Sequence, residues 1–370
     1  MRLPNIYRLN FFSRPRRRFH IKDDDYQIGL DRWMTLKDCP SAFGFDADGV
    51  NFYIDLTQAR LNAWVPMQPS STLTAYEQSA FFQAMADELN ASPFSRATIV
   101  FALQPNDKTV DNPYSVVEKA ISLGYIKDLA TCFQGFQQQC AHKGKDLRIV
   151  IRYAAEMNTK DKQYVWNRNS SLPPDQQEAI FKKTFRMVRE AFHDVSPAFL
   201  MAFSPAIRSD ITIQTIDNYF PGKQYIDRVS CSWYCGDLDS LQVATSKFTD
   251  YLSRMRNLLT DGNSSALISC AIDELGGCDS KTRIWKPGDP ELTDLDTGQV
   301  FSPGQAIELG KNHQNVLPLM LTSIGHQAPS FQFDYVTLFL AGKWDTRQKV
   351  TNMVNITPRS FPPTVVPVEP

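Results

Sequence analysis

Residues 148–158 read RIVIRYAAEMN, a short apolar run that is followed at once by an acid and an amide. The run has the length and the β-branched content of a buried strand. Glu156 and Asn158 follow it, and Arg152 precedes the acid by four residues. Polar side chains directly after a strand are typical of α/β folds that collect functional groups at the carboxyl ends of their strands.

Similar apolar runs recur along the chain and alternate with amphipathic stretches, as repeated βα units do. The strongest predicted strands are 97–103, 148–153, 199–203, 226–232, 266–272 and 316–322. Two weaker strands precede them, one at 42–45 or 51–56 and one at 61–67. Helical patterns cover 74–89 and 174–192, and the second begins with prolines and carries one apolar stripe.

These elements predict a (β/α)8 TIM barrel, because about eight strands are present and no Gly-rich phosphate loop follows the first. We expect a single domain with loop insertions at the C-terminal face of the barrel. The predicted division is a basic arm over 1–40, the barrel over 41–350 and a Pro-rich tail over 351–370. The irregular stretch 278–304 is predicted to be a long loop over that face.

The first twenty residues hold six arginines and no acid, which is typical of a basic arm. No apolar h-region follows, so a signal peptide is not predicted, and no run approaches the ~20 apolar residues of a membrane span. The arm is a candidate contact for an assembly partner. The location stays open: outside the cell, or on a surface or virion, if the protein acts on glycans, and the cytoplasm otherwise.

The formal net charge of −1, from 39 basic and 40 acidic residues, argues against a general nucleic-acid binder. The seven cysteines lack the spacing of a zinc site, so no metal is predicted. No P-loop, nucleophile elbow or His-Glu-x-x-His motif is present, and no cofactor is expected. Because the net charge is close to zero, a neutral or weakly charged substrate is easier to accommodate than a highly charged one.

Two predicted strand ends carry carboxylates. A partly desolvated Glu156 keeps its proton near neutral pH and can protonate a leaving oxygen, although a salt bridge with Arg152 is the alternative. The stretch ALISCAIDELGG (266–277) ends with Asp273 and Glu274. Because side chains alternate along a strand, we expect only one of these two to point into the barrel mouth. Carboxylates on separate strand ends can approach to about 5 to 5.5 Å, the spacing of retaining glycosidases.

A third strand end, SWYCGD, offers aromatic side chains. Aromatic faces bind the apolar faces of sugar rings, and a tyrosine adds a polar tip. A place in the core is the alternative for each of these residues. The candidate substrate contacts outside the carboxylates are Arg152, Asn158, Trp166, Trp233, Tyr234, Trp285 and His326.

Five segments in the same order resemble glycoside hydrolase family 26, the retaining barrel enzymes that include β-mannanases. They are ISLGYIKDL (121–129), RIVIRYAAEMN (148–158), AFSPA (202–206), YFPGKQYIDRVSCSWY (219–234) and AIDELGG (271–277). The resemblance extends from about residue 43 to residue 344 and implies a (β/α)8 barrel. It also implies Glu156 as acid/base, Glu274 as nucleophile and Tyr234 as the residue that contacts the nucleophile, with Arg152 and Asn158 in support.

The resemblance implies a retaining endo-β-glycan hydrolase that degrades polysaccharide by a two-glutamate double displacement. Two departures concern the substrate. Ala155 stands where the family commonly has His, and TKDKQYVW (159–166) replaces its Gly and Trp, which leaves Tyr164 or Trp166 as a substitute. The alternative is a weakly active or inactive barrel that serves as a carbohydrate-binding or structural subunit of a surface or virion assembly.

Overall fold

The computed structural model describes the central part of the chain. The described residues are 19–22, 47–63, 95–159, 164–167, 172–208, 211–235, 238–262, 268–276, 292–293, 300–301, 320, 323–324, 327 and 331–338. Within these ranges no helix is both long enough and apolar enough to cross a membrane.

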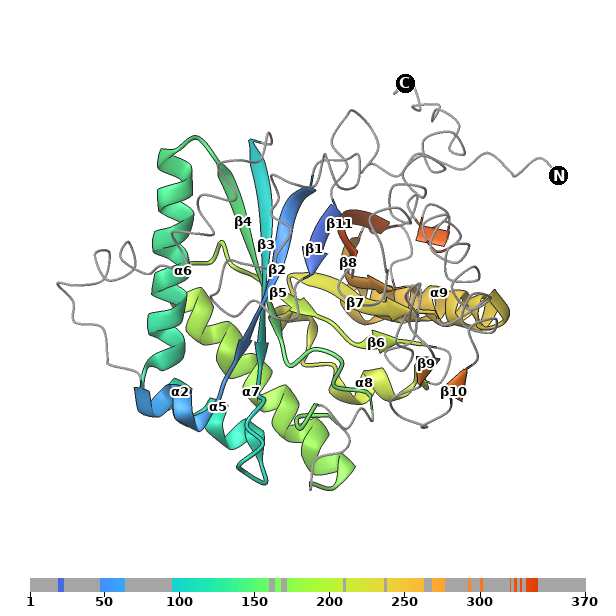
Figure 1. Cartoon of the computed structure of the whole chain (residues 1–370), viewed down its shortest axis with the longest axis horizontal. Helices are drawn as coiled ribbons and strands as arrows, with labels where there is room; N and C mark the ends of the chain where they lie inside the picture. The colour runs from blue at the N-terminus through green and yellow to red at the C-terminus, as the bar shows by residue number, and fades with distance from the viewer. Residues whose placement is uncertain are drawn as a thin grey trace.

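The described elements alternate between strands and helices for most of the chain (Figure 1). The strands are β1 (Phe19–Lys22), β2 (Ala47–Asp55), β3 (Arg96–Gln104), β4 (Asp146–Tyr153), β5 (Leu200–Phe203), β6 (Ala206–Ile207), β7 (Arg228–Tyr234), β8 (Ile268–Gly276), β9 (Leu292–Thr293), β10 (Val300–Phe301) and β11 (Phe331–Leu338). The helices are α2 (Gln58–Ala63), α5 (Pro113–Ser122), α6 (Tyr125–His142), α7 (Pro174–Val195), α8 (Thr215–Tyr219) and α9 (Leu238–Thr260), with a 3-10 turn η2 (Lys223–Tyr225).

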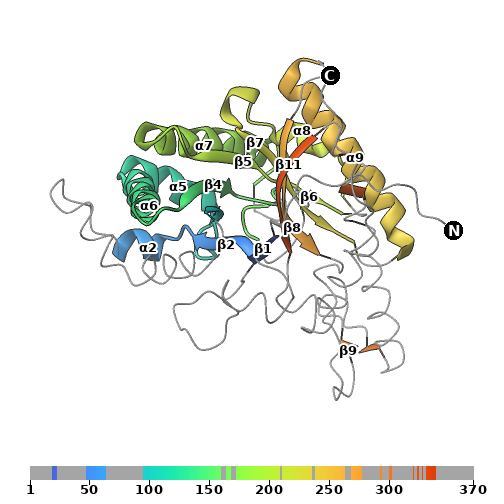
Figure 2. The ribbon, with the colours of Figure 1, turned by 90° about the horizontal axis from the view of Figure 1, so that it is seen from above.

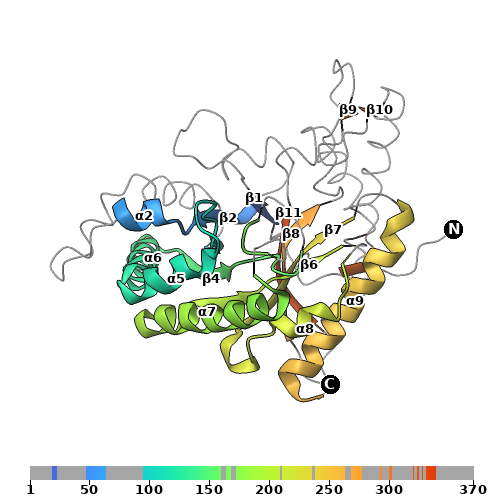
Figure 3. The ribbon, with the colours of Figure 1, turned by 90° about the horizontal axis from the view of Figure 1, so that it is seen from below.

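Eight parallel strands close into a ring in chain order. The pairs run from β1 to β2, β3, β4, β5, β7, β8 and β11, and β11 pairs again with β1. The short strand β6 follows β5 after two residues and pairs with β7. A closed ring of parallel strands, each joined to the next by a crossover, is the predicted (β/α)8 barrel. Figures 2 and 3 show α5, α6 and α7 on one side of it and α9 on the other.

Most of the predicted strands are confirmed. β3, β4 and β5 lie where the sequence predicts them, and β7 begins two residues later than predicted. β2 supports the alternative at 51–56, while 42–45 lies outside the described residues. Predicted helix 174–192 is confirmed as α7, and predicted helix 74–89 lies outside the described residues.

One predicted strand is wrong at its described residues, and a second is described at one residue alone. Residues 61–63 of the predicted strand 61–67 are helical, because the Thr57 hydroxyl accepts from Arg60 N and starts a helix in which Leu61 is buried. In the predicted strand 316–322, Met320 is helical. The eighth strand is instead β11, FQFDYVTL, whose aromatic and β-branched residues favour a strand.

Two further elements refine the predicted organisation. β1 lies inside 1–40, the range predicted as a basic arm, so the first strand of the ring precedes the predicted boundary. Its pairing with β2 and β11 closes the ring. In the predicted long loop 278–304, β9 and β10 form a two-stranded antiparallel sheet.

Local sequence explains where the central helices begin. The Asn112 side chain accepts from Tyr114 N at 3.1 Å, and Pro113 occupies the first turn of α5. Pro174 begins α7, Asp175 lies in its first turn and His193 lies in its last. Both charged positions suit the helix dipole, the second when the imidazole is protonated. The apolar stripe of α7 is buried against the barrel through Phe181, Phe185 and Val188, as the sequence predicts.

The barrel has an apolar outer layer and a largely polar axis. Outside the strands, Phe101 stacks on Phe133 of α6 with ring centroids 3.8 Å apart, and Trp233 stacks on Phe248 of α9 at 4.2 Å. Inside the ring, a small separate cluster contains Val100, Val150, Ala202, Ala271 and Tyr335. This apolar layer is thin, and the polar groups around Arg152 occupy the axis next to it.

Buried phenols predict how the fold responds to alkali. Burial raises the pKa of five buried tyrosines above the ordinary value of 10.0, namely Tyr114, Tyr153, Tyr234, Tyr251 and Tyr335. Their folded-state pKa is raised, so their contribution to stability is fully present below pH 10 and is lost as the pH rises above it. A spectrophotometric titration should find these phenols protonated until the chain unfolds. Ionisation of all thirteen tyrosines in a folded protein would contradict this.

Candidate active site

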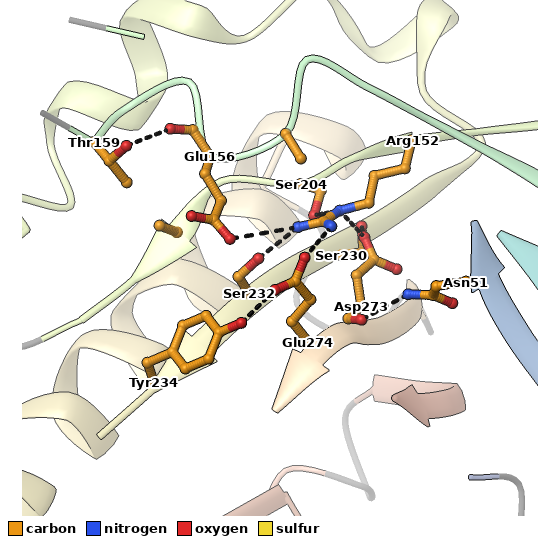
Figure 4. A network of polar contacts seen from close by, with 12 residues as sticks. Asn51, Arg152, Glu156, Thr159, Ser204, Ser230, Ser232, Tyr234, Asp273 and Glu274 are labelled. Atoms are coloured by element: carbon orange, nitrogen blue, oxygen red, sulfur yellow. Dashed lines mark hydrogen bonds and ion pairs between the residues drawn. The ribbon is translucent and has the colours of Figure 1, made fainter. Parts of the chain in front are cut away.

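Arg152 lies on the barrel axis and is 1% exposed. Its guanidinium contacts three carboxylates (Figure 4). Nη1 donates to Glu274 Oε1 at 2.5 Å, Nε lies 3.1 Å from Asp273 Oδ2, and Nη2 lies 3.8 Å from Glu156 Oε1. The same side chain also donates to Ser204 Oγ at 2.9 Å and to Ser232 Oγ at 2.5 Å. One cation therefore connects groups from β4, β7 and β8 and from the end of β5.

Glu274 is 2% exposed and accepts hydrogen bonds at both carboxylate oxygens. Tyr53 OH on β2 donates to Oε1 at 2.7 Å, and Tyr234 OH on β7 donates to Oε2. With Arg152, three donors from three strands surround this carboxylate. Such an arrangement stabilises the ionised form and fixes the plane of the carboxyl group. The contact between Tyr234 and Glu274 is the one that the family resemblance implies.

Asp273 also faces the barrel axis, which corrects the prediction that only one of Asp273 and Glu274 points inward. In the pairing of β7 with β8, Cys231 lies opposite Ile272 and Ser232 lies opposite Glu274, so Asp273 is an extra residue. A β-bulge of this kind breaks the alternation of side chains and turns two consecutive residues to one face. Asp273 is fully buried.

Glu156 stands on a tight turn after β4 and is 6% exposed. Two residues of the turn have left-handed backbone angles, Ala154 with φ 44° and Glu156 with φ 59°. Glu156 N donates to Ser204 O at 2.8 Å, and Thr159 N donates to Glu156 O at 3.0 Å. Left-handed angles in residues other than glycine are strained and cluster at functional sites, where the surrounding contacts maintain them.

Asn158 supports this turn through both ends of its amide. Nδ2 donates to Ala206 O at 2.9 Å, and Oδ1 accepts from Ala206 N at 2.8 Å. The side chain is 4% exposed and connects the turn after β4 to β6. These two hydrogen bonds hold the turn that carries Glu156 against β6.

The carboxylates of the site raise the pKa values of two side chains that donate to them, Arg152 and Tyr234. Burial alone would lower the pKa of Arg152, but the charges of Glu274 and Asp273 raise it well above its ordinary value. Burial and the charge of Glu274 raise the pKa of Tyr234 well above 10.0. Both side chains therefore keep their protons and donate to Glu274 across the neutral range.

The shared guanidinium also limits how far apart the two glutamates lie. Glu156 Oε1 is 3.8 Å from Nη2, and Glu274 Oε1 is 2.5 Å from Nη1. Because both nitrogens belong to one planar group, the two oxygens are less than roughly 9 Å apart. This upper limit is compatible with the carboxylate separations of both retaining and inverting glycosidases.

The structure does not support a platform role for two of the aromatic candidates. Trp233 is fully buried on the outer side of β7 and stacks on Phe248, so its predicted contact with a sugar is wrong. Trp166 is 1% exposed and supports the turn from below, where its Nε1 donates to Ala155 O at 2.9 Å. At this exposure the ring of Trp166 offers no open face to a sugar. Trp285 and His326 lie outside the described residues.

Sequence reasoning missed Tyr53, Ser204, Ser232 and Tyr335. A signal for two of them was present. Polar residues recur at every second position in NFYID of β2 and in RVSCSWY of β7, which marks the face that points to the axis. Tyr53 and Ser232 lie on these faces. Ser204 and Tyr335 carry no such signal, because their contacts depend on closure of the ring.

A cavity of about 510 Å³ opens at the opposite end of the barrel, where the strands begin. Its lining includes Arg148, Arg228 and Asp334, and Arg228 Nη2 pairs with Asp334 Oδ2 at 2.5 Å. This end of a barrel usually serves stability, so the cavity is separate from the glutamate site. In the part of the chain that the structure describes, no group of His, Cys, Asp and Glu side chains is arranged to hold a metal ion.

Comparison with known proteins places this fold among β-mannanase structures. A modular endo-β-1,4-mannanase of glycoside hydrolase family 26 from Cellulomonas fimi is 12% identical, with a TM-score of 0.52 over 95% of this chain and 75% of that chain. The catalytic domain of a family 26 endo-β-1,4-mannanase from Bacillus sp. JAMB-750 is 14% identical, with a TM-score of 0.53 over 93% and 86%. A family 26 β-mannanase from Bacteroides ovatus is 13% identical, with a TM-score of 0.50 over 93% and 88%.

No protein-family model and no curated protein sequence matches the chain. The chain therefore has the fold of the family 26 glycoside hydrolases at a sequence identity of 12–14%. At this identity the likeness concerns the fold, and function has to be argued from the site itself.

Because Arg152 is buried and Arg96 is exposed, we expect their replacement to lower the free energy of unfolding by different amounts. Arg152→Met should lower the free energy of unfolding by about 3–5 kcal/mol, because it leaves buried carboxylates without their cation. Arg96→Met is the matched control, since the ion pair of Arg96 with Asp146 joins neighbouring strands and is exposed. Its loss should cost less than about 1 kcal/mol. Denaturant unfolding of the two variants measures the difference, and equal costs would contradict the role of Arg152.

Proposed function

We propose that the protein is a retaining glycoside hydrolase that cleaves β-linked polysaccharide, with Glu156 as acid/base and Glu274 as nucleophile. The observation that carries the proposal is the single guanidinium of Arg152 between these two glutamates at the carboxyl ends of β4 and β8. The fold shared with family 26 β-mannanases supports the same chemistry. A β-1,4-mannan is the first substrate to test.

Charge balance supports the assignment of roles. Glu156, Asp273 and Glu274 together would carry three negative charges around one guanidinium, and a buried excess of this kind favours binding of a proton. Glu274 and Asp273 contact Arg152 at 2.5 and 3.1 Å, whereas Glu156 lies at 3.8 Å, beyond hydrogen-bond distance. The proton therefore belongs on Glu156, which makes it the acid.

The reaction follows from these states. One oxygen of the Glu274 carboxylate attacks the anomeric carbon, and the glycosidic bond breaks as Glu156 gives its proton to the leaving oxygen. Glu156, now a carboxylate, then takes a proton from water, whose oxygen attacks the anomeric carbon and releases Glu274. Tyr53 and Tyr234 hold the Glu274 carboxyl group in place before and after the attack.

Substitution of the two glutamates tests the activity. Wild-type protein should release reducing ends from β-1,4-mannan or, if the substrate has changed, from xylan, mixed-linkage glucan or an exopolysaccharide. Glu274→Ala should abolish this release while the protein stays folded. Glu156→Ala should lower kcat by about 10²–10⁴-fold. Glu190→Gln, an exposed position on α7, is the control and should leave the rate unchanged. Wild-type protein that binds a glycan without cleaving it would favour the binding subunit instead.

The stereochemistry of the products tests the roles of the two residues. A retaining enzyme releases a product whose anomeric configuration matches the substrate, which NMR of the first-formed product detects. With an activated glycoside and azide, Glu156→Ala should give the β-glycosyl azide and Glu274→Ala the α-glycosyl azide. Inverted products from the wild-type protein would overturn the double displacement and leave hydrolysis as such in place.

A further inference from the structure

Asp273 is the third carboxylate on Arg152 and lies deeper than the two glutamates. Its Oδ2 lies 3.1 Å from Arg152 Nε and accepts from Ser230 Oγ at 2.5 Å, and its Oδ1 accepts from Tyr335 OH at 2.6 Å. Asp273 and Tyr335 are both fully buried. In Figure 4, Asp273 lies on the side of the guanidinium away from Glu156. From this position Asp273 can act on a substrate only through Arg152.

The guanidinium divides its nitrogens among the three acids. Nε faces Asp273, Nη1 faces Glu274 and Nη2 faces Glu156. The ionisable side chains around this group come from every neighbouring strand that carries one: Tyr53 on β2, Glu156 after β4, Tyr234 on β7, Asp273 and Glu274 on β8, and Tyr335 on β11 behind Asp273. Only Asp273 among the three acids has no part in the proposed reaction.

The proposed reaction moves one negative charge across Arg152. Before the first step, Glu274 is ionised and Glu156 holds a proton. In the covalent intermediate, Glu274 is a neutral ester and Glu156 is ionised. A guanidinium held only by the two glutamates would follow the charge towards Glu156 and leave Glu274, which must depart as a carboxylate in the second step. A constant charge beside Nε opposes this movement, because it acts on the third corner of the planar group. Ser204 Oγ and Ser232 Oγ accept from Nε and Nη2 and help to fix the same orientation, but they carry no charge.

We propose that Asp273, fixed by Tyr335 and Ser230, is a positioning residue that holds the Arg152 guanidinium between the two glutamates while the negative charge passes from Glu274 to Glu156. The inference rests on the proposed function and extends it to residues that do not touch the substrate.

The backbone supports a role beyond packing. The register of β8 shifts at Asp273, and this bulge brings both Asp273 and Glu274 to the inner face beside Arg152. Asn51 Nδ2 donates to Asp273 O at 2.8 Å and satisfies the carbonyl at the bulge. A buried ion pair is seldom more stable than an apolar pair of the same volume. The buried charge of Asp273 is thus a carboxylate that stability alone does not require.

A titration without substrate tests the position of the charge. Protein carrying ¹³C-labelled glutamate is titrated by NMR, and the signals of Glu156 and Glu274 are assigned with Glu156→Gln and Glu274→Gln. In Asp273→Asn the full charge of Arg152 acts on the glutamates, so Glu156 should lose its proton at a pH about one unit lower, as expected for one charge several ångström away at an effective dielectric constant of about 20. An unchanged or higher titration point would overturn the proposal.

Two neutral variants extend the test if Asp273→Asn does not fold. Tyr335→Phe and Ser230→Ala each remove one donor to Asp273 and keep every charge. We expect a smaller shift of Glu156 in the same direction, because a less firmly held Asp273 lets the guanidinium of Arg152 move towards the glutamates. The matched control is Tyr153→Phe, because Tyr153 is equally buried, lies beside Arg152 on β4 and donates outward to Thr184 Oγ1 at 2.9 Å. A shift in the control equal to that in Tyr335→Phe would overturn the proposal.

Kinetics on a cleaved glycan supply the second readout. Asp273→Asn should lower kcat by about 10²-fold, the loss that a misplacement of roughly 1 Å can cause, while KM stays unchanged. Tyr335→Phe should lower kcat less, and Tyr153→Phe should not change it. A rise in KM at constant kcat would overturn the positioning role. If the wild-type protein cleaves no glycan, the proposed function fails, whereas the titration still decides whether Asp273 controls the charge on Glu156.

Discussion

The guanidinium of Arg152 is the constraint on which the centre of this barrel depends. A cation that is 1% exposed has to be neutralised and fully hydrogen-bonded, because an unpaired buried charge costs several kcal/mol. The partners come from four places in the chain, namely the turn after β4, the end of β5, β7 and β8. Apart from the local contact with Glu156, these contacts join Arg152 to other strands of the ring. The polar site and the closed barrel therefore form together.

The outer sides of the strands form the packed core, and their inner sides carry the polar site. The outer side packs aromatic rings against the helices, as Phe101 does with Phe133 and Trp233 with Phe248. The inner side carries Ser230, Ser232 and Tyr234 on β7, each of which contacts an acid or Arg152. Since successive side chains point to opposite sides, one strand serves both purposes. This division also explains why Trp233 and Tyr234, which are adjacent in sequence, have unrelated roles.

The chain shares its fold with family 26 structures at low sequence identity, so the fold by itself does not determine the substrate. The nucleophile candidate Glu274 is held by two phenols and a guanidinium, and the acid candidate Glu156 stands on a strained turn. Ala155 lies on that turn and is 3% exposed, with its carbonyl bonded to Trp166. The position where the family commonly has His thus carries a small buried side chain. The described part of the site therefore differs from the family pattern at this position.

The sequence by itself determined the βα alternation, five of the eight barrel strands in nearly their final positions, and the two strand ends that carry Glu156 and Glu274. Apolar periodicity and a polar residue after each run are local signals, so they can be recognised without knowledge of the fold. Only the tertiary structure decided that β1 and β11 close the ring, that Asp273 joins Glu274 on the inner face, and that Trp166 and Trp233 are buried. These outcomes depend on pairing register and on which side of a strand meets a helix. Both are set by contacts between residues far apart in the chain, which no local pattern records.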